Sequence, residues 1–595
     1  MLFMLILLFS INGPVGDSAE VSQDTTTADL IKIFEIPDII QFGDIEKTIS
    51  RTVLPVYETE PSIEDMDLGD LLFRTPAVIA NQGRGQFKSI IRRGTPAQTL
   101  TFYLNGHRLT DRLNSRFNLT DIPLYALEAT STGFNLFGDP MIDLRTKINR
   151  YEIPFSYIRV TTGGFGATAY NIDFTRAINN DLGLYLNGLY HTSAENRENS
   201  DFTLNSFYTD LYYNQIVPSR FDFIYSSNEY GFPGDDLDTL NRSCVEKLTD
   251  ASFVFGSDNH HIAFYYTTYH RHFTNTTSQI IYSDDTRTTG IDLENYNKVG
   301  FFNIIYRLIG EASGVESDLC NTHNSKTLHL WTVLHLPFNS FDLFAGDRSE
   351  TDNFTDFQHA PFLYSMAELY DSTYIFGRLG RNYRKPSIYE SSAQPAPPYS
   401  SIRGDPSLNP EYCWVQEVGI QGRHFTVAVY KYLFENLIIL QPDGDDIYQP
   451  TALESWRSLG IENYFDSKLK IRKCPTRNSE TEITVGFTGN LLIDGDSLPF
   501  IPKANSNLFA SIVMKSEKFL FRVDAEGQFF SKRFGYNGEE LEPFHTLSIT
   551  ATARFVTLSF TLRTDNILNQ QYNFVPNYTM PQRNFNFTIK WEFWN

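Results

Sequence analysis

From about residue 150 to residue 595, apolar and polar residues alternate in short segments that are separated by polar turns. Every second residue from Leu508 to Met514 is apolar, and the alternation resumes at Phe519 after a charged turn. Residues 547–553 and 556–562 repeat the pattern, with serines and threonines on the opposite face. Because side chains alternate between the two faces of a strand, a period of two predicts β-strands with one apolar face. The short turns predict antiparallel hairpins.

Alternation alone is compatible with two kinds of all-β protein. The apolar face packs against a second sheet in a soluble sandwich, whereas it contacts lipid in a transmembrane barrel whose polar face lines the lumen. The connections favour the barrel, because short turns contrast with long polar stretches at 195–201, 226–243, 311–326 and 390–410. At roughly 20 residues per strand, residues 150–595 supply about 22 antiparallel transmembrane strands, a size whose lumen needs a plug.

The first 149 residues are predicted to contain three further segments. Residues 1–11 are an apolar run with the length of a signal-peptide core, so we predict a signal peptide over 1–18, with a buried element of a soluble protein as the alternative. Residues 19–44 form an acidic, Thr-rich extension. Residues 45–149 mix a short helical pattern at 65–72 with short strand patterns, which predicts a small α/β domain. Its predicted strands are 89–92, 99–104 and 141–145.

Composition and charge exclude several classes of protein. The chain has 49 Lys+Arg against 71 Asp+Glu, a net charge of −22, which argues against nucleic-acid binding because phosphate contacts need clustered cations. Aromatic residues make up 15% of the chain, so it can bury too much apolar surface to be disordered. The 4 cysteines include no C-x-x-C pair, which leaves isolated thiols or at most two disulfides.

The sequence contains no common signature of hydrolases, zinc proteases or nucleotide-binding enzymes, and we predict that the protein is not an enzyme. His260 and His261 are adjacent, so in a strand they point to opposite faces and chelate poorly. Two acidic clusters in predicted loops are candidate structural Ca²⁺ sites, although solvated loop tips are the favoured interpretation. They comprise Asp235, Asp236, Asp238, Asp443, Asp445 and Asp446. No other cofactor is predicted.

Residues 89–109 contain the pair Arg93-Gly94 on a predicted strand, followed by Asn105-Gly106 at a predicted hairpin. Asn-Gly suits a tight turn because both residues tolerate a positive φ. This arrangement resembles the plug motif of the TonB-dependent outer-membrane receptors, in which an Arg-Gly strand precedes an Asp-Gly turn. The flanking residues 68–72, 75–78, 119–123 and 127–128 are also similar to that motif's surroundings.

Two stretches of the predicted barrel resemble the same family. Residues 382–390, 404–411 and 417–419 are similar to its mid-barrel signature. The C-terminus resembles its closing strands, and ends in aromatic residues similar to the signal that the barrel assembly machinery reads. The residues of this C-terminal signature are Asn566, Leu568, Tyr572, Pro581, Arg583, Phe585 and Phe593.

The resemblance implies a barrel of about 22 strands in the bacterial outer membrane with residues 45–149 as a plug in its lumen. It also implies a receptor that binds a scarce nutrient at its extracellular loops and imports it. The implied ligand is a metal chelate, a cobalamin-like molecule or a glycan. The implied partners are an inner-membrane TonB-type complex that supplies energy, outer-membrane lipid and the assembly machinery.

Two departures from the family pattern bear on energy coupling. Residues 136–144 lack the Gly-Gly step that usually precedes the last plug strand. The candidate energy-coupling segment is Glu35, Ile36, Pro37, Asp38, Ile39 and Ile40, an extended stretch that can add a strand to a partner sheet. A simple linker, or the first plug strand, is its alternative interpretation. The departures leave open an uncoupled barrel that acts as a pore or as a surface-binding or structural protein.

Arg93 is predicted to face the barrel wall and to pair with a lumen-facing carboxylate, because a guanidinium makes such pairing specific in a confined site. The alternative is an arginine in a water-filled gap. Since Arg92 and Arg93 are adjacent in a predicted strand, they are expected to point to opposite faces.

Overall fold

The computed structural model describes residues 53–594, apart from short gaps at 62–64, 66, 77, 82–87, 96–98, 110, 116, 149–153, 216, 232–241, 258–259, 277–278, 354–355, 371, 397–399, 445–446, 474–478, 496–497 and 517. The predicted signal peptide, the acidic extension and the candidate energy-coupling segment therefore lie outside the described residues.

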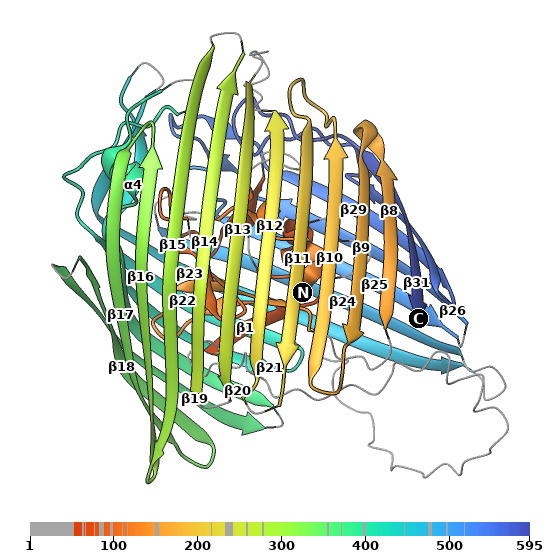
Figure 1. The fold of residues 1–595 in the computed structure, drawn as a ribbon, viewed down its shortest axis with the longest axis horizontal. Coiled ribbons are helices and arrows are strands. Elements are labelled where there is room, and N and C mark those ends of the chain that lie inside the picture. Colours follow the sequence, from red (N-terminus) through yellow and green to blue (C-terminus); the bar gives the residue numbers. More distant parts are fainter. Residues whose placement is uncertain are drawn as a thin grey trace. The chain divides into compact units, whose positions relative to one another are not determined.

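Among the described residues, 22 antiparallel strands close into one barrel (Figure 1), which confirms the predicted fold class. Each strand pairs with its neighbours in sequence, and β31 pairs with β8 to close the ring. The barrel strands are β8 (Phe155–Gly163), β9 (Thr168–Ala177), β10 (Leu182–Ser193), β11 (Phe202–Tyr213), β12 (Ser219–Gly231), β13 (Arg242–Ser257), β14 (His260–Asn275), β15 (Ile280–Val299), β16 (Phe302–Ser317), β17 (Asn321–Pro337), β18 (Phe341–Asp352), β19 (Asp356–Tyr370), β20 (Thr373–Arg384), β21 (Glu411–Gly422), β22 (Phe425–Pro442), β23 (Tyr448–Lys473), β24 (Ser479–Gly495), β25 (Ala504–Lys515), β26 (Phe519–Phe530), β29 (Phe544–Phe555), β30 (Leu558–Asp565) and β31 (Asn584–Trp594).

The alternation of side chains places apolar residues outside the barrel and polar residues inside it. Ile172 and Leu508 are more than half exposed on the outer face, whereas Asn507 and Thr561 are buried on the inner face. An exposed apolar belt around a closed sheet is the lipid-facing surface of a transmembrane barrel. Among the described residues, no helix is long and apolar enough to cross a membrane.

The connections differ between the two ends of the barrel. One end, the turn end, has short links such as 300–301 and 423–424, and the other, the loop end, has links as long as 385–410. The prediction of a long loop at 311–326 is wrong, because β16 and β17 continue through these polar residues to a hairpin at 318–320. Likewise, β12 and β13 extend into the predicted loop at 226–243. A strand that projects past the lipid needs no apolar face, so polarity alone does not mark where it ends.

The loop end also carries short elements of its own. They are η5 (Gly164–Gly166), α4 (Ile388–Ser392), β27 (Arg533–Phe534) and β28 (Glu540–Leu541). Helix α4 begins with a capping box in which Ser387 and Glu390 each accept from the other's backbone N–H.

The segment before β8 forms a small α/β unit. A 5-stranded sheet has the order β1 (Val53–Thr59), β6 (Leu127–Phe134), β7 (Pro140–Thr146), β4 (Thr101–Leu104) and β5 (His107–Leu109). Further elements are α3 (Leu68–Leu72), the ribbon of β2 (Val78–Asn81) and β3 (Lys88–Ile91), and the 3-10 turns η3 (Leu119–Asp121) and η4 (Leu124–Ala126). The predicted helix starts later than expected because the Asp67 side chain caps it, accepting from the Asp70 N–H at 3.2 Å.

This unit, the plug, is contacted by side chains from strands around the barrel. Residues that hydrogen-bond to it include Arg159 on β8, Arg220 on β12, Asp250 on β13, Arg307 on β16, Arg348 on β18, Arg378 on β20, Asn507 on β25 and Arg563 on β30. Contacts from so many strands place the plug in the lumen. The predicted domain boundary at 149/150 falls between the end of β7 and the start of β8.

Candidate functional site: the plug anchor and the cavity above it

Arg93 lies in a buried cluster that joins the plug to the barrel wall, and we call this cluster the plug anchor. It consists of Arg92 and Arg93 from the plug, Arg378 from β20, Glu417 from β21 and Glu462 from β23. Each of these five side chains is almost completely buried. Their long sequence separations show that the barrel and the plug build the cluster together.

The geometry of the plug anchor is that of a charged network. The Arg93 Nη2 atom donates to Glu417 Oε1 at 2.6 Å, and its Nε atom donates to Glu462 Oε2 at 3.1 Å. Arg92 reaches the same Glu462 at 3.2 Å, and Arg378 donates to Glu417 at 2.7 Å. The Tyr57 hydroxyl adds a hydrogen bond to Glu462 at 2.9 Å. The predicted pairing of Arg93 with a wall carboxylate is therefore present in the structure.

The expectation that Arg92 and Arg93 point to opposite faces is wrong, since both reach Glu462. Strand β3 ends at Ile91, and the next residues form a turn in which Arg93 has φ 51° and Gly94 has φ 75°. Strand alternation does not apply to a turn. A Cβ on Gly94 would lie 3.1 Å from the Leu492 side chain, so this turn is suited to glycine by both backbone and space.

The charge of Arg93 is stabilised in this setting. Burial on its own lowers the pKa of Arg93, but Glu417 and Glu462 outweigh that effect and raise the pKa well above its usual value. The guanidinium also stacks over the Phe134 ring, with its Cζ atom 3.9 Å from the ring centre. Arg93 is thus held in its charged form by two carboxylates of the barrel wall.

Asn105 and Gly106 form the hairpin turn between β4 and β5, with φ 45° and 108°. The Asn105 side chain accepts from the Thr146 N–H at 3.0 Å, which ties the turn to the end of β7. The Gly106 carbonyl accepts from Arg307 of the wall at 3.1 Å. The second half of the sequence motif therefore forms another contact between plug and barrel.

A cavity of about 320 Å³ lies between the plug and the wall of β16–β22. Its plug side is formed by β4, by Arg108 of β5, by Arg112 and Ser115 after that strand, and by the β6–β7 hairpin. Its wall side is formed by β17, β18, the end of β20 and the start of β21. Its lining includes charged and ionisable side chains from both sides, which are Arg108, Arg112, Asp139, His329, Arg348, Glu350, Asp352, Arg384, Lys385 and Glu411.

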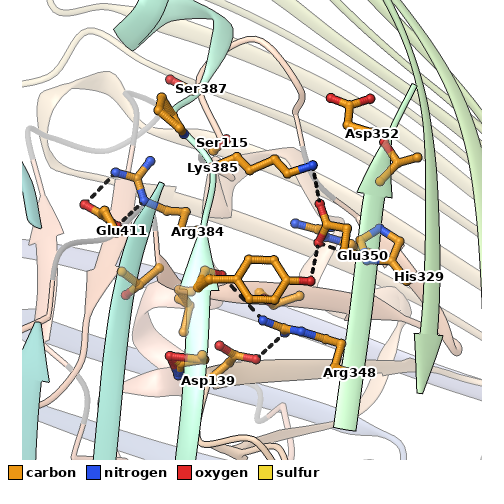
Figure 2. Close-up of a pocket in the computed structure, with 18 of the residues that line it drawn as sticks. Ser115, Asp139, His329, Arg348, Glu350, Asp352, Arg384, Lys385, Ser387 and Glu411 are labelled. Atoms are coloured by element: carbon orange, nitrogen blue, oxygen red, sulfur yellow. Dashed lines mark hydrogen bonds and ion pairs between the residues drawn. The ribbon is translucent and has the colours of Figure 1, made fainter. Parts of the chain in front are cut away.

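The charges of the cavity form separate groups, as Figure 2 shows. Arg348 donates to Asp139 at the tip of the β6–β7 hairpin at 2.6 Å. Glu350 lies on β18, as Arg348 does, and its Oε2 atom is 3.1 Å from the His329 Nδ1 atom. The same oxygen accepts a hydrogen bond from the Tyr383 hydroxyl at 3.1 Å. The cavity thus brings plug and wall charges into one space.

Two models of protein families match this chain. Residues 96–593 match the model described as TonB dependent receptor-like, beta-barrel, and residues 44–131 match the TonB-dependent Receptor Plug Domain. The chain belongs to the TonB-dependent receptor family. The family's barrel implies an outer-membrane location, and its fold is that of transport receptors rather than of enzymes.

Solved structures of other proteins share the fold. The siderophore receptor PirA from Acinetobacter baumannii is 12% identical, with a TM-score of 0.70 over 91% of this chain and 98% of that chain. A variant of the ferric enterobactin receptor PfeA from Pseudomonas aeruginosa, in complex with enterobactin, is 12% identical with a TM-score of 0.70, over 91% and 100%. The copper transporter OprC is 14% identical, with a TM-score of 0.73 over 94% and 100%. The search of curated proteins finds no match.

A part of the receptor's mid-barrel signature, residues 382–388 and Glu411, lines the cavity, whereas Glu417 of the same signature belongs to the plug anchor. Arg384, at the end of β20, donates to Glu390 of α4 at 2.7 Å and to Glu411 at the start of β21 at 2.6 Å. The 385–410 connection is therefore closed at its base by one arginine. The Lys385 side chain, next in sequence, lines the cavity.

The C-terminal signature residues do not line the cavity. Asn566 binds the loop that follows β30, donating to the Gln570 carbonyl at 2.8 Å and to the Pro581 carbonyl at 3.3 Å. Tyr572 stacks on Phe544. Leu568 and Phe585 are exposed, Phe593 contacts Trp591, and the Arg583 N–H donates to Asn569. The role of this segment in barrel assembly stays a prediction.

The candidate Ca²⁺ sites fall mostly outside the described residues. Only Asp443 of the six aspartates is described, and it forms an ion pair with Arg403. The described part of the chain contains no group of three or more His, Cys, Asp or Glu side chains that could hold a metal ion. Cys244, Cys320 and Cys413 are free, buried thiols. The calcium prediction remains untested.

For several site residues the sequence carries no local signal of what they contact, although Glu417 begins the stretch 417–419 that resembles the mid-barrel signature. Glu417 and Glu462 on separate strands meet Arg93 more than 300 positions away, and Trp331 and Arg348 reach the cavity from β17 and β18. The available clue is a charged residue at an inward position of a strand, as Arg348 and Glu350 share one face of β18. That pattern indicates which side chains face the lumen, but it does not indicate which plug residues they contact.

Proposed function

We propose that this receptor binds a small nutrient in the cavity between plug and wall and imports it through the barrel with energy from an inner-membrane TonB-type complex. The observation that carries the proposal is that the cavity is lined from both sides. A ligand there contacts the plug and the wall at once, so that binding can alter the contacts that hold the plug.

The interactions around the plug support an uptake cycle rather than a fixed seal. The plug is held mainly by side-chain ion pairs, side-chain hydrogen bonds and apolar contacts, whereas barrel strands pair with one another through their backbones. Such side-chain contacts can be exchanged without opening the sheet. The barrel can therefore stay intact while the plug moves.

The test removes residues 20–44 from the full chain in a host that lacks its own uptake of the nutrient. A panel of metal chelates, cobamides and glycans is supplied at limiting concentration, and growth and ligand binding by whole cells are measured. We expect deletion to abolish energised uptake and to leave surface binding intact, because the deleted segment carries the candidate energy-coupling residues 35–40. Replacing residues 20–30 by a Gly/Ser stretch of equal length is the matched control and should preserve growth.

If uptake survives the deletion and also survives collapse of the proton gradient, the receptor is an uncoupled pore. If binding persists with no uptake in any variant, it is a surface-binding protein.

A further inference from the structure

Strand β23 extends past its neighbour β22 at the turn end of the barrel. The last pair between the two strands joins Phe425 to Phe465, whereas β23 continues to Lys473 and stays paired with β24 over that distance. In the described part of the chain, no strand pairs with residues 467–473 on the β22 side. We call this side of residues 467–473 the open edge.

The backbone groups of alternate residues point into the open edge. The Asp466 N–H donates to the His424 carbonyl at 2.9 Å, so residue 466 directs its backbone towards β22. In an antiparallel strand, every second residue directs both its N–H and its C=O to the same side. The pairing of β23 with β24 is regular from residue 460 to residue 473, so the alternation continues. Lys468 and Lys470 therefore offer backbone donors and acceptors at the open edge.

The open edge lies outside the hydrocarbon of the membrane. Unpaired backbone groups are not tolerated where they contact lipid. The side chains agree with this location, since Lys468 is 46% exposed and Lys470 is 59% exposed. In barrels of this kind the short turns are periplasmic and the long loops are extracellular. The open edge therefore faces the periplasm.

The two faces of the sheet beside the open edge differ in chemistry. Lys468 and Lys470 lie on the inner face, because they are an even number of residues from Glu462, which points inward to the plug anchor. Leu469 and Ile471 lie on the outer face and are 57% and 39% exposed. A strand that pairs with the open edge therefore meets charges on one face and apolar side chains on the other.

The charges beside the open edge are mainly positive. Residues 468–473 include four basic residues and no acidic one. Glu480 and Glu482 of β24 form ion pairs with Lys468 and Lys470, which leaves an excess of positive charge. Like charges directly opposite one another destabilise an antiparallel pair, so lysines at an open edge disfavour a second copy of the same strand. An acidic strand gains from the cross-strand attraction instead.

We propose that the open edge of β23 binds an extended segment of a periplasmic protein in which acidic and apolar residues alternate. The segment adds to the sheet as one more strand and bonds to the backbone of Lys468 and Lys470. Its acidic residues face these lysines on the inner face, and its apolar residues cover Leu469 and Ile471. This interaction surface is separate from the cavity and does not depend on the proposed uptake.

The test measures the binding of fluorescent peptides to the purified full-length receptor by anisotropy. The first probe is an octapeptide of alternating glutamate and valine, and the second has lysine in place of glutamate. The third is the acidic octapeptide with every amide N-methylated, so that it has no backbone donor. We expect only the first probe to bind, and we expect its binding to weaken at high salt because the attraction is between exposed charges.

Two variants test the open edge, and a third is their control. Lys470→Pro removes an N–H that points into the open edge but none that bonds to β24, and it should abolish binding of the acidic probe. Lys468→Gln keeps the backbone and removes one charge, so binding should weaken about two- to fivefold. Lys532→Gln is the matched control, because Lys532 is also 46% exposed and ion-paired, with Glu540, but lies at the loop end. It should bind as the wild type does.

The proposal is overturned if the wild type does not bind the acidic probe, or if the lysine probe or the N-methylated probe binds as tightly. It is also overturned if Lys470→Pro, folded as judged by its mobility shift on boiling, binds as Lys532→Gln does. If Lys470→Pro does not fold, the N-methylated probe decides. A receptor dimer that light scattering detects in the wild type and not in Lys470→Pro would assign the open edge to a second copy, against the proposal.

Discussion

At the scale of single residues, the plug anchor shows that the contacts of the Arg93-Gly94 motif are made with partners far away in the sequence. Arg93 is 1% exposed and is enclosed by Glu417, Glu462 and the Phe134 ring. Removing one member of a buried charged pair leaves the other charge uncompensated, which costs about 3–5 kcal/mol. Arg92 and Arg378 contact the same carboxylates, so they can absorb a part of that cost.

Arg93→Ala is therefore expected to loosen the plug while the barrel still assembles. The measurements are protease resistance of the plug and sensitivity of cells to a large antibiotic that the outer membrane excludes. Arg93→Lys should be intermediate at best, because a lysine cannot bridge both carboxylates with a planar fork. Arg457→Ala is the control, since that side chain is 69% exposed. Wild-type protease resistance and permeability in Arg93→Ala would show that the pairing contributes little.

The sequence could identify Arg93 and Gly94 as a motif and could assign Arg93 a carboxylate partner, because a buried guanidinium needs one. It could not name Glu417 or Glu462 as that partner. Residues 417–419 resemble the mid-barrel signature, but nothing local shows that Glu417 meets Arg93, and nothing local distinguishes Glu462 from other inward-facing acidic residues. It also misplaced Arg92, because the strand ends one residue before it and the turn brings both arginines to one side.

At the scale of elements, the loop end holds the plug through a small apolar seam. Leu113 of the plug packs in one cluster with Leu319 and Cys320 of the β16–β17 hairpin and with Ala393 after α4. The Leu113 carbonyl accepts from the Tyr389 N–H at 2.8 Å. The seam thus joins three elements that surround the cavity. The sequence does not predict this seam, because it predicts a long polar loop at 311–326 where the structure has the β16–β17 hairpin.

Cys320 can report on this seam. Burial raises the pKa of the Cys320 thiol to about 12, so at pH 8 the folded protein keeps it protonated and slow to react. In an unfolded chain the thiol titrates near pH ~8.5. We therefore expect slow alkylation of Cys320 by iodoacetamide at pH 8 in the folded receptor and fast alkylation in denaturant, as measured by peptide mass spectrometry.

Leu113→Ala should speed this alkylation in the folded state. A leucine-to-alanine change in a packed cluster costs about 2–5 kcal/mol, and the resulting cavity lies beside the thiol. Leu568→Ala is the matched control, since Leu568 is exposed and lies outside the seam. Equal rates for Cys320 in the two variants would show that the plug does not protect the hairpin.

At the scale of the whole molecule, the number of barrel strands and the apolar outer face could be predicted from the sequence. They follow from the chain length and from the alternation of apolar and polar residues. Lipid on the outside requires apolar residues at every second position, and 446 residues of such a pattern, the predicted span 150–595, suffice for about 22 strands. The plug was recognised by the absence of that pattern, although β1 and β6 were not predicted. Their side chains are set by contacts with the wall, as in the Tyr57–Glu462 bond, rather than by alternation within the segment.

The barrel and its plug also differ in what stabilises them, which leads to a prediction about the pore. Each described barrel strand is paired on both sides, so the closed sheet satisfies its backbone without the plug. The plug fills a lumen that is too wide for wall side chains to fill by themselves. Removing residues 45–149 should therefore leave a folded, heat-modifiable barrel and should raise its single-channel conductance in planar bilayers sharply.

The comparison is made among three purified proteins: the wild type, the plug deletion and Arg93→Ala. The deletion should conduct continuously, because its inward-facing polar and charged side chains become hydrated once the plug is gone. Arg93→Ala should stay mostly closed with brief openings, since contacts such as Arg348–Asp139 and His107–Asp250 still hold the plug. A mobility shift on boiling must accompany each measurement, so that a low conductance cannot be ascribed to an unfolded barrel. A folded deletion variant that conducts no better than the wild type would mean that the wall closes the lumen without the plug.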